Sequence, residues 1–378
     1  MNQKWQTMLL MLALVASVSV AQAQNVKITP LGQRTGDFCA LDRALLFEDP
    51  TGVRILYDPG NTITGATDPR LGDVHAILVT HAHGDHLGAV ILNQNPDAAN
   101  AVCAGNFPSV TTPNSVTAEI AAAKKSAVFA NATLASFIGT KIAGLSGMPM
   151  GMPTAGCPGA GLGNEVVVPR QSPCTGPLNS GAKRTVRLSS PSQGVQTSQG
   201  VQINGVTAEH PSDPPLTLLN DQLRTLLAAN GVTAYVGLSQ GFVITFTNGL
   251  KVYLSGDTGW THEMDSILKS FFGVNLVVIN ISDSFVTGPP EAAFAISLIQ
   301  PRAVIPSHVN EVATTGGIVN SGTRTEQFIN LISELRLKPS DDVRNTPGPP
   351  RRLQAHIPLS GITMQFDGDA QCVAGCRR

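Results

Sequence analysis

The sequence AILVTHAHGDHLG, residues 76–88, carries the strongest structural signal in this chain. Its first four residues are continuously apolar, which is typical of a strand buried on both faces. His81 and His83 follow that strand two residues apart on an extended segment, so both imidazoles can point the same way. Asp85 and His86 come next, at the turn into a predicted helix. One short loop therefore carries four side chains that can bind a metal ion.

Three further candidate ligands follow strand-like stretches elsewhere in the chain. His210 ends one such stretch, Asp257 follows the second strand of a hairpin predicted around the Asn-Gly turn at 248–249, and His308 follows the buried strand 303–305. Together with the first loop they make seven ligands, more than the four of one tetrahedral zinc site. The sequence therefore predicts two divalent metal ions about 3.5–4 Å apart, zinc in the first place, with manganese or iron as alternatives.

The predicted elements fall into two similar halves. A hairpin, a buried strand, a polar loop and a helix appear in this order before residue 100 and again after residue 240. Two packed sheets with helices outside would follow from this order. The predicted elements are hairpins at 45–57 and 242–254, strands at 76–79, 274–279 and 303–305, and helices at 291–299, opened by the prolines at 289–290, and at 325–335.

Composition limits the classes of protein that remain. With 378 residues, 42% of them hydrophobic, the chain can bury a large core. Its 25 basic and 26 acidic residues give a net charge of −1, so no basic excess points to nucleic acid. The segment 144–181 is rich in glycine and proline. It predicts an inserted loop within a single domain, either a surface excursion or a lid over the site.

The first 23 residues have the pattern of a secretory signal. Lys4 precedes an apolar run at 8–20, and the sequence AQA at 21–23 suits a signal peptidase. A mature domain at 24–378, periplasmic or secreted and without a membrane span, is therefore expected. Six cysteines could pair in that oxidising setting in fifteen ways. Short loops favour Cys157 with Cys174 and Cys372 with Cys376.

The ordered set of candidate ligands resembles the metallo-β-lactamase superfamily. The resemblance covers residues 26–340 apart from the glycine- and proline-rich insertion. It is closest to the ascorbate-phosphate lactonase-like branch of metal-dependent hydrolases, on the sequences YLSGDTG at 253–259, ISDSFVTGP at 281–289, EAA at 291–293 and VIPSH at 304–308. It implies an α/β fold, a four-layered αβ/βα sandwich with the metal ions at one edge.

The resemblance also implies roles for single residues. The first ion would be held by His81, His83 and His210, the second by Asp85, His86 and His308, with Asp257 bridging both and Asp58 orienting a ligand histidine. Water held between the two cations would lose a proton near neutral pH and act as the nucleophile. Asp85 and Asp257, which would hold these cations, are therefore the candidate catalytic residues. Three loop residues, His262, Asp283 and Asn310, are candidates for binding substrate or supporting the ligands, or else surface and turn residues.

These observations favour an exported metal-dependent hydrolase that cleaves a lactone, ester or amide bond in a small molecule. A phosphodiesterase or phospholipase D-like enzyme is the main alternative, because two-metal sites also serve phosphoryl transfer. The segments around the ligands contain few lysines and arginines, which favours neutral substrates. A β-lactamase is less favoured, since antibiotic-hydrolysing members of the family usually lack the aspartate found here as Asp257. A noncatalytic metal-binding protein is a further alternative, and the oligomeric state stays open.

Overall fold

The architecture comes from a computed structural model, which describes residues 25–147, 156–157, 164–189, 200–337 and 351–377. The expected signal peptide, residues 1–23, lies outside the described residues. In the described part of the chain, no helix is both long and apolar enough to cross a membrane.

Two eight-stranded mixed sheets form the body of the molecule. In spatial order the first consists of β22 (Cys372–Ala374), β21 (Met364–Phe366), β1 (Val26–Pro30), β2 (Leu45–Glu48), β3 (Arg54–Tyr57), β4 (Ala76–Leu78), β7 (Ala127–Ala130) and β9 (Cys174–Pro177). The second consists of β20 (Gln354–Ala355), β15 (Ala303–Ser307), β14 (Leu276–Asn280), β13 (Lys251–Leu254), β12 (Gln240–Thr245), β11 (Val201–Thr207), β10 (Lys183–Leu188) and β8 (Glu165–Val168).

Short elements complete the described structure. The two-stranded pairs are β5 (Val90–Leu92) with β6 (Ser109–Thr111), β16 (Thr314–Thr315) with β17 (Ile318–Val319), and β18 (Arg336–Leu337) with β19 (Arg351–Arg352). The α-helices are α1 (Gly84–Leu87), α2 (Val116–Lys124), α3 (Ala132–Leu145), α4 (Asp221–Ala229), α5 (Pro289–Ile299) and α6 (Arg324–Glu334). A 3-10 turn, η1 (Leu216–Leu218), and a π-helical segment, η2 (Met264–Phe272), lie between them.

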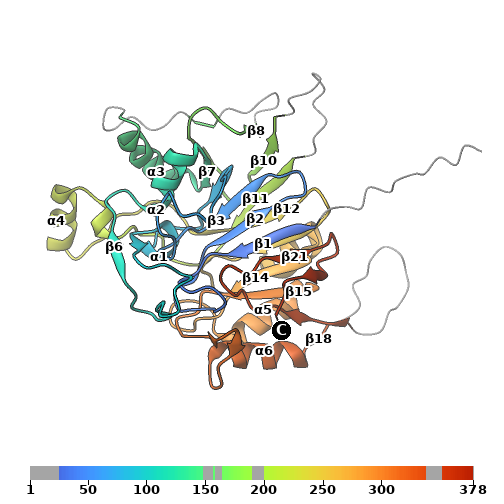
Figure 1. Cartoon of the computed structure of the whole chain (residues 1–378). Coiled ribbons are helices and arrows are strands. Elements are labelled where there is room, and N and C mark those ends of the chain that lie inside the picture. Colours follow the sequence, from blue (N-terminus) through green and yellow to red (C-terminus); the bar gives the residue numbers. More distant parts are fainter. Residues whose placement is uncertain (1–24, 148–155, 158–163, 190–199, 338–350, 378) are drawn as a thin grey trace, which may run out of the picture.

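Three hydrophobic clusters define four layers. The first lies between the sheets and joins side chains such as Phe129 of β7 and Phe242 of β12. The second packs α5, α6 and η2 onto the outer face of the second sheet, and the third packs α2 and α3 onto the outer face of the first. Figure 1 shows these two helix pairs on opposite sides of the strands. This is the αβ/βα sandwich expected from the sequence, because each sheet buries both of its faces.

The elements predicted around the ligands are confirmed. The first hairpin is β2 and β3, paired antiparallel, and the second is β12 and β13 around the Asn-Gly turn. The buried runs form β4, β14 and β15, which pair in parallel with their neighbours. Helix α5 begins with its two prolines, where a first helical turn tolerates them. Helix α6 begins after Thr323, whose side chain accepts a hydrogen bond from the Glu326 amide.

The segment 144–181 is more than the loop that its composition predicts. Among its described residues, β8 pairs in parallel with β10, and β9 pairs in parallel with β7. Val166 and Leu178 are fully buried in the cluster between the sheets. The prediction of an inserted loop is therefore wrong for the described part of this segment, because single short strands extend sheets that are built elsewhere in the chain. β9 is an edge strand of the first sheet, and β8 is an edge strand of the second.

All six cysteines are paired in the structure. Cys157 bonds Cys174 and Cys372 bonds Cys376, as expected from their proximity in the sequence. The third bond joins Cys39 to Cys103 across 64 residues. It ties the segment before β2 to the loop between β5 and β6.

Candidate metal centre

The candidate ligands come from both sheets and meet at one edge of the sandwich. His81 and His83 follow β4, and Asp85 and His86 lie on the single turn of α1. The remaining three follow strands of the second sheet, with His210 after β11, Asp257 after β13 and His308 after β15. The structure thus brings together all seven residues that the sequence singled out, although up to 227 positions separate them along the chain.

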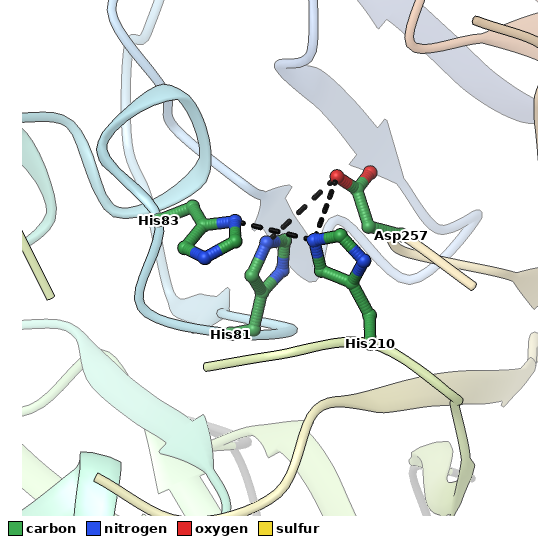
Figure 2. Close-up of side chains that lie close together, drawn as sticks. All are labelled: His81, His83, His210 and Asp257. Carbon is green, nitrogen blue, oxygen red and sulfur yellow. Dashed lines mark hydrogen bonds and ion pairs between the residues drawn. The ribbon is translucent and has the colours of Figure 1, made fainter. Parts of the chain in front are cut away.

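The first group consists of His81, His83, His210 and Asp257. One ligand atom from each lies within 4.8 Å of the others. His210 Nε2 is 3.2 Å from His83 Nδ1 and 3.6 Å from Asp257 Oδ2, and His81 Nε2 is 3.8 Å from the same carboxylate oxygen. Figure 2 shows the three imidazoles turned toward one another with the Asp257 carboxylate beside them. Three nitrogens and one oxygen make a donor set that suits zinc.

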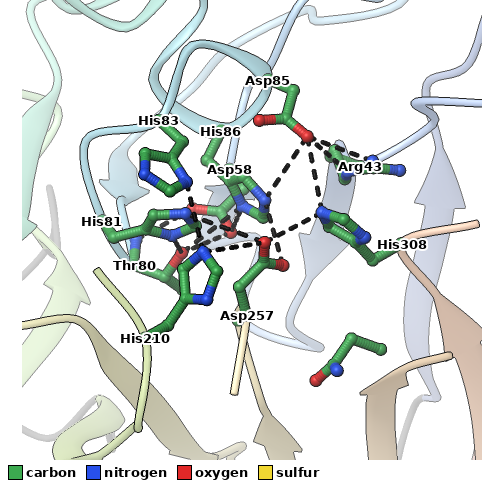
Figure 3. A network of polar contacts seen from close by, with 12 residues as sticks. Arg43, Asp58, Thr80, His81, His83, Asp85, His86, His210, Asp257 and His308 are labelled. Carbon is green, nitrogen blue, oxygen red and sulfur yellow. Dashed lines mark hydrogen bonds and ion pairs between the residues drawn. The ribbon is translucent and has the colours of Figure 1, made fainter. Parts of the chain in front are cut away.

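The second group consists of Asp85, His86 and His308, again within 4.8 Å of one another. Asp257 contacts this group as well, because its Oδ1 is 3.2 Å from His86 Nε2 and its Oδ2 is 2.9 Å from His308 Nε2. His308 Nε2 is also 3.4 Å from Asp85 Oδ2. Figure 3 shows Asp257 between the two groups. Its carboxylate is therefore placed to serve two ions at once.

The burial of these atoms tests whether the residues fit metal ions. His81 Nε2, His86 Nε2 and Asp257 Oδ1 are buried without a hydrogen-bond partner. Buried polar atoms without partners are costly, and coordination to a cation would satisfy each of the three. The donor atoms converge from both groups on the space next to Asp257. The residues present therefore fit two divalent ions.

Asp58 and Thr80 orient histidines in both groups. Asp58 is fully buried after β3, and its Oδ2 is 2.8 Å from His86 Nδ1, so the histidine can donate there and keep Nε2 for a metal ion. Thr80 donates to the same carboxylate from its amide and its hydroxyl, at 2.9 and 2.8 Å. The Thr80 hydroxyl in turn lies 3.0 Å from His81 Nδ1. Thr80 was not identified from the sequence, where nothing but its place before His81 marks it.

Arg43 contacts the second group, and no sequence signal marked it as part of the site. Its side chain is 1% exposed, and Nε and one terminal nitrogen lie 3.2 and 3.1 Å from Asp85 Oδ2. The same terminal nitrogen donates to Asn310 Oδ1 at 2.9 Å. A cation therefore does lie against the ligands, contrary to the expectation from nearby sequence, because Arg43 precedes Asp85 by 42 positions. Asn310, a predicted supporting residue, reaches the site through Arg43.

His83 has a partner of its own on the outer side of the first group. Its Nε2 is 3.4 Å from Asp213 Oδ1, so the ring can donate to that carboxylate and present Nδ1 toward His210. Asp213 stands three positions after His210, and that spacing is the signal that could have identified it.

The structure does not bring His262 and Asp283 to the ligands. His262 is exposed just before η2, and among the described residues it makes no hydrogen bond or ion pair with either group. The Asp283 carboxylate is 61% exposed and faces Arg324 at 3.8 Å. His356 also lies near Cys372 and Cys376, but those two sulfurs are bonded to each other and so are not ligands.

Burial and neighbouring charges set the protonation of the site. Burial, reinforced by the neighbouring His86, holds the pKa of His81 well below its usual value. Burial acts the same way on His86, but Asp257 and other nearby carboxylates outweigh it and raise the pKa of that histidine. Burial would raise the pKa of Asp257, yet His308 and His86 outweigh it and hold the pKa well below its usual value. An ionised Asp257 and a neutral His81 are the forms that metal binding requires.

Comparison with known proteins places the chain in a family. The model of the beta-lactamase superfamily domain matches residues 42–308, a span that contains all seven ligands. This chain belongs to the metallo-β-lactamase superfamily. Among its relatives are proteins named UPF0173 metal-dependent hydrolase from Rubrobacter xylanophilus, 26% identical over 78% of this chain and 90% of that protein, and from Cupriavidus necator, 29% identical over 68% of each.

Solved structures with a similar fold include Igni18, described as a novel metallo hydrolase from Ignicoccus hospitalis. It is 17% identical and covers 91% of this chain and 100% of its own, with a TM-score of 0.48. Assignment to the lactonase-like branch within the superfamily stays a prediction, because these names specify no substrate.

Proposed function

We propose that this chain is a dinuclear metal-dependent hydrolase that cleaves a lactone, ester or amide bond in a small molecule. The observation that carries the proposal is the Asp257 carboxylate, which contacts ligands of both groups while its Oδ1 has no hydrogen-bond partner. Relatives named metal-dependent hydrolases support the same chemistry. Divalent cations held there would supply Lewis acidity and activate water as a nucleophile.

The residues of the chain hold and orient the site. The first ion would be held by His81, His83 and His210, the second by Asp85, His86 and His308, and Asp257 would contact both. The Asp58 carboxylate and the Thr80 hydroxyl fix two histidine rings, so that Nε2 of each faces Asp257. Zinc suits these nitrogen and carboxylate donors, and manganese and iron are the alternatives.

The charges at the site favour a neutral substrate. A phosphodiester carries a permanent negative charge, and its enzymes commonly supply lysine or arginine to bind it. In the described part of the chain, Arg43 is the cationic side chain that contacts the ligands, and it is buried against Asp85 and Asn310. A guanidinium that is 1% exposed and already paired is not free to bind phosphate.

Export is also part of the proposal. The signal-like pattern in residues 1–23 supports it, as do three disulfides that use every cysteine. Expression with the full leader, followed by N-terminal sequencing of the protein from the periplasm or medium, should give a mature start near residue 24. An uncleaved protein retained in the cytoplasm would contradict it.

The test of the catalytic proposal joins metal analysis to a substrate panel. The purified protein, stripped and then reloaded with zinc, manganese or iron, is assayed on a γ-lactone, phenyl acetate, an aryl amide, bis(4-nitrophenyl) phosphate and a β-lactam. We expect two ions per chain and turnover of a lactone, ester or amide at least as fast as of the phosphodiester. Phosphodiester cleavage alone would support the phosphodiesterase alternative, and two bound ions with no turnover would support a metal-binding protein.

Asp257→Asn is the variant that tests the shared ligand. It keeps the size of the side chain but removes the charge that faces both groups. We expect at least a hundredfold loss of kcat/KM and fewer than two ions per chain by elemental analysis, with near-ultraviolet circular dichroism unchanged. A variant that keeps two ions and full activity would rule out the bridging role of Asp257.

A further inference from the structure

A pocket opens directly beside the first ligand group. Its volume is about 230 Å³, and its walls include His210, Asp213, Thr233, Ala234, Tyr235 and Leu238. His210 is both a wall of the pocket and a candidate metal ligand, because its Nε2 lies 3.6 Å from Asp257 Oδ2. The pocket therefore borders one of the candidate ligands of the first group.

Hydrogen bonds fix the two walls of this pocket relative to each other. Ser239 Oγ donates to the Pro211 carbonyl at 3.0 Å, which joins the segment after His210 to the segment before β12. Asn131, the N-terminal cap of α3, donates from Nδ2 to the Leu238 carbonyl at 2.8 Å. At Gly237, where φ is +96°, a Cβ would lie 2.1 Å from Asn131 Oδ1, so this close approach requires glycine. The pocket is thus a built feature of the fold.

The described lining is mostly apolar and contains no lysine or arginine. Tyr235 and Leu238 expose 69% and 72% of their surface, although large apolar side chains usually gain by burial. The described residues that line the pocket include no lysine or arginine, and Asp213 contributes a carboxylate. This described lining therefore offers an anionic group no cationic side chain, whereas an uncharged apolar group would cover Tyr235 and Leu238.

We propose that this pocket binds an uncharged apolar part of the substrate, about the size of one aromatic ring or a short acyl chain, while the scissile group lies at the metal ligands. The size follows from the volume, because a cavity of about 150 Å³ suffices for a benzene ring. The inference rests on the proposed hydrolase function and adds the substrate class to it: neutral esters, lactones or amides with a compact apolar substituent.

Metal-binding probes that are not hydrolysed test the pocket apart from catalysis. Acetohydroxamic acid, phenylacetohydroxamic acid and succinohydroxamic acid share one metal-binding group and differ in carrying a methyl group, a ring or a carboxylate. Titration calorimetry on the zinc-loaded protein should show the phenyl probe binding at least about tenfold more tightly than the acetyl probe, as burial of a ring predicts. The carboxylate probe should bind no better than the acetyl probe.

Variants of the pocket test whether Tyr235 and Leu238 cause the preference for the phenyl probe. Tyr235→Ala combined with Leu238→Ala should reduce the preference for the ring to less than about threefold. Phe271→Ala is the matched control, because Phe271 is 78% exposed on η2 and does not line the pocket, so the preference should stay as in the parent. In methyl-labelled protein, the phenyl probe should shift the NMR signals of Leu238 and Ala234.

The outcomes separate this inference from the proposed function. Equal affinity for the phenyl and acetyl probes, or no shift at Leu238 when the phenyl probe is at saturation or at millimolar concentration, would overturn the pocket proposal whatever the activity. A ring preference that depends on Tyr235 and Leu238, together with no turnover of any carbonyl substrate, would uphold the pocket and contradict the hydrolase.

Discussion

Asp58 and Thr80 link the two ligand groups through one carboxylate. Asp58 accepts directly from His86 of the second group, and through the Thr80 hydroxyl it also reaches His81 of the first group. A single buried side chain therefore sets the orientation of two rings that would serve different ions. Such supporting contacts matter because a ligand must be presented in one tautomer and one direction.

Arg43 should strengthen the binding of a metal ion by the second group, because it contacts Asp85. Arg43→Gln removes both contacts to Asp85 Oδ2 and the contact to Asn310. We expect one of two bound zinc ions to bind about 10- to 100-fold more weakly, because residues that orient a ligand typically contribute that much. The other ion should keep its affinity, since His81, His83 and His210 do not contact Arg43. Competition with a chromophoric chelator resolves the two affinities.

The control for Arg43 is Arg54→Gln. Arg54 is likewise paired with a carboxylate, although it is less buried than Arg43, and its partner Glu48 lies away from the ligands. Its removal should leave both zinc affinities unchanged. Two ions bound to Arg43→Gln with the parent affinities would show that Asp85 needs no support.

Asp42 gives a prediction about pH and stability. Burial raises the pKa of its carboxyl from 3.8 to about 7, although the Cys39 and Gln33 amides donate to it. Between these values the folded state keeps a proton that the unfolded state has released, so the free energy of unfolding falls as pH rises. The effect amounts to at most about 4 kcal/mol, at 1.36 kcal/mol per pKa unit. Above pH 7 the stabilisation is fully lost.

The measurement compares Asp42→Asn with the parent by urea denaturation from pH 3.5 to 8. Asparagine does not ionise, so the variant should gain stability relative to the parent as pH rises from about 4 to 7, and the difference should be level above pH 7. Using the difference removes the contribution of the metal ligands, which both proteins share. Asp221→Asn, at a carboxylate that is 90% exposed, serves as the control. A stability difference between Asp42→Asn and the parent that does not change with pH would contradict the raised pKa of Asp42.

The sequence identified the ligands but not most of the residues that support them. His81, His83, Asp85 and His86 were predictable because one loop presents them together, and His210, Asp257 and His308 because each follows a strand. Arg43 and Thr80 have no such signal, since their roles depend on contacts that the fold creates. His262 and Asp283 looked suitable because they follow strands or ligands closely, yet their side chains face solvent or Arg324.

At the scale of elements, the buried strands and hairpins near the ligands were predicted and the strands of segment 144–181 were not. β4, β14 and β15 are continuous apolar runs, which is a strong local signal. β9 has the sequence CTGP, with no apolar run, and it is a strand because β7 supplies its hydrogen-bonding partners. Pairing between distant segments cannot be read from local composition.

Leu178 tests whether segment 144–181 belongs to the core. Leu178 is fully buried between the sheets, whereas Leu145, at the end of α3, is 40% exposed. Leu178→Ala should lower the free energy of unfolding by about 2–5 kcal/mol, because it leaves a cavity. Leu145→Ala, the matched change in the same segment, should stay within about 0.5 kcal/mol of the parent. Chemical denaturation measures both, and equal effects would mean that the segment is a surface excursion.

For the whole molecule, the disulfides should stabilise the fold more when they enclose a longer stretch of chain, with a logarithmic dependence on its length. The Cys39–Cys103 bond spans 64 residues and the Cys372–Cys376 bond spans 4. Loop-closure entropy predicts losses of about 4 and about 2 kcal/mol when each pair is replaced by alanine. Guanidinium denaturation of the two double variants gives these losses. A larger loss for the short loop would contradict the entropic account.

The position of the metal centre across both sheets has a consequence for how the protein acquires its ions. The ligands begin at His81 and end at His308, and Asp257 contacts a histidine from each sheet. No fragment of the chain that ends before His308 contains all seven candidate ligands, so a complete site requires both sheets to be in place. The affinity of a given set of ligands for divalent metals follows a fixed order. A protein can nevertheless bind a metal of lower affinity when that metal is the more available one where the protein folds. We therefore expect the metal supply of the compartment in which the chain finishes folding to influence which ion the site takes up.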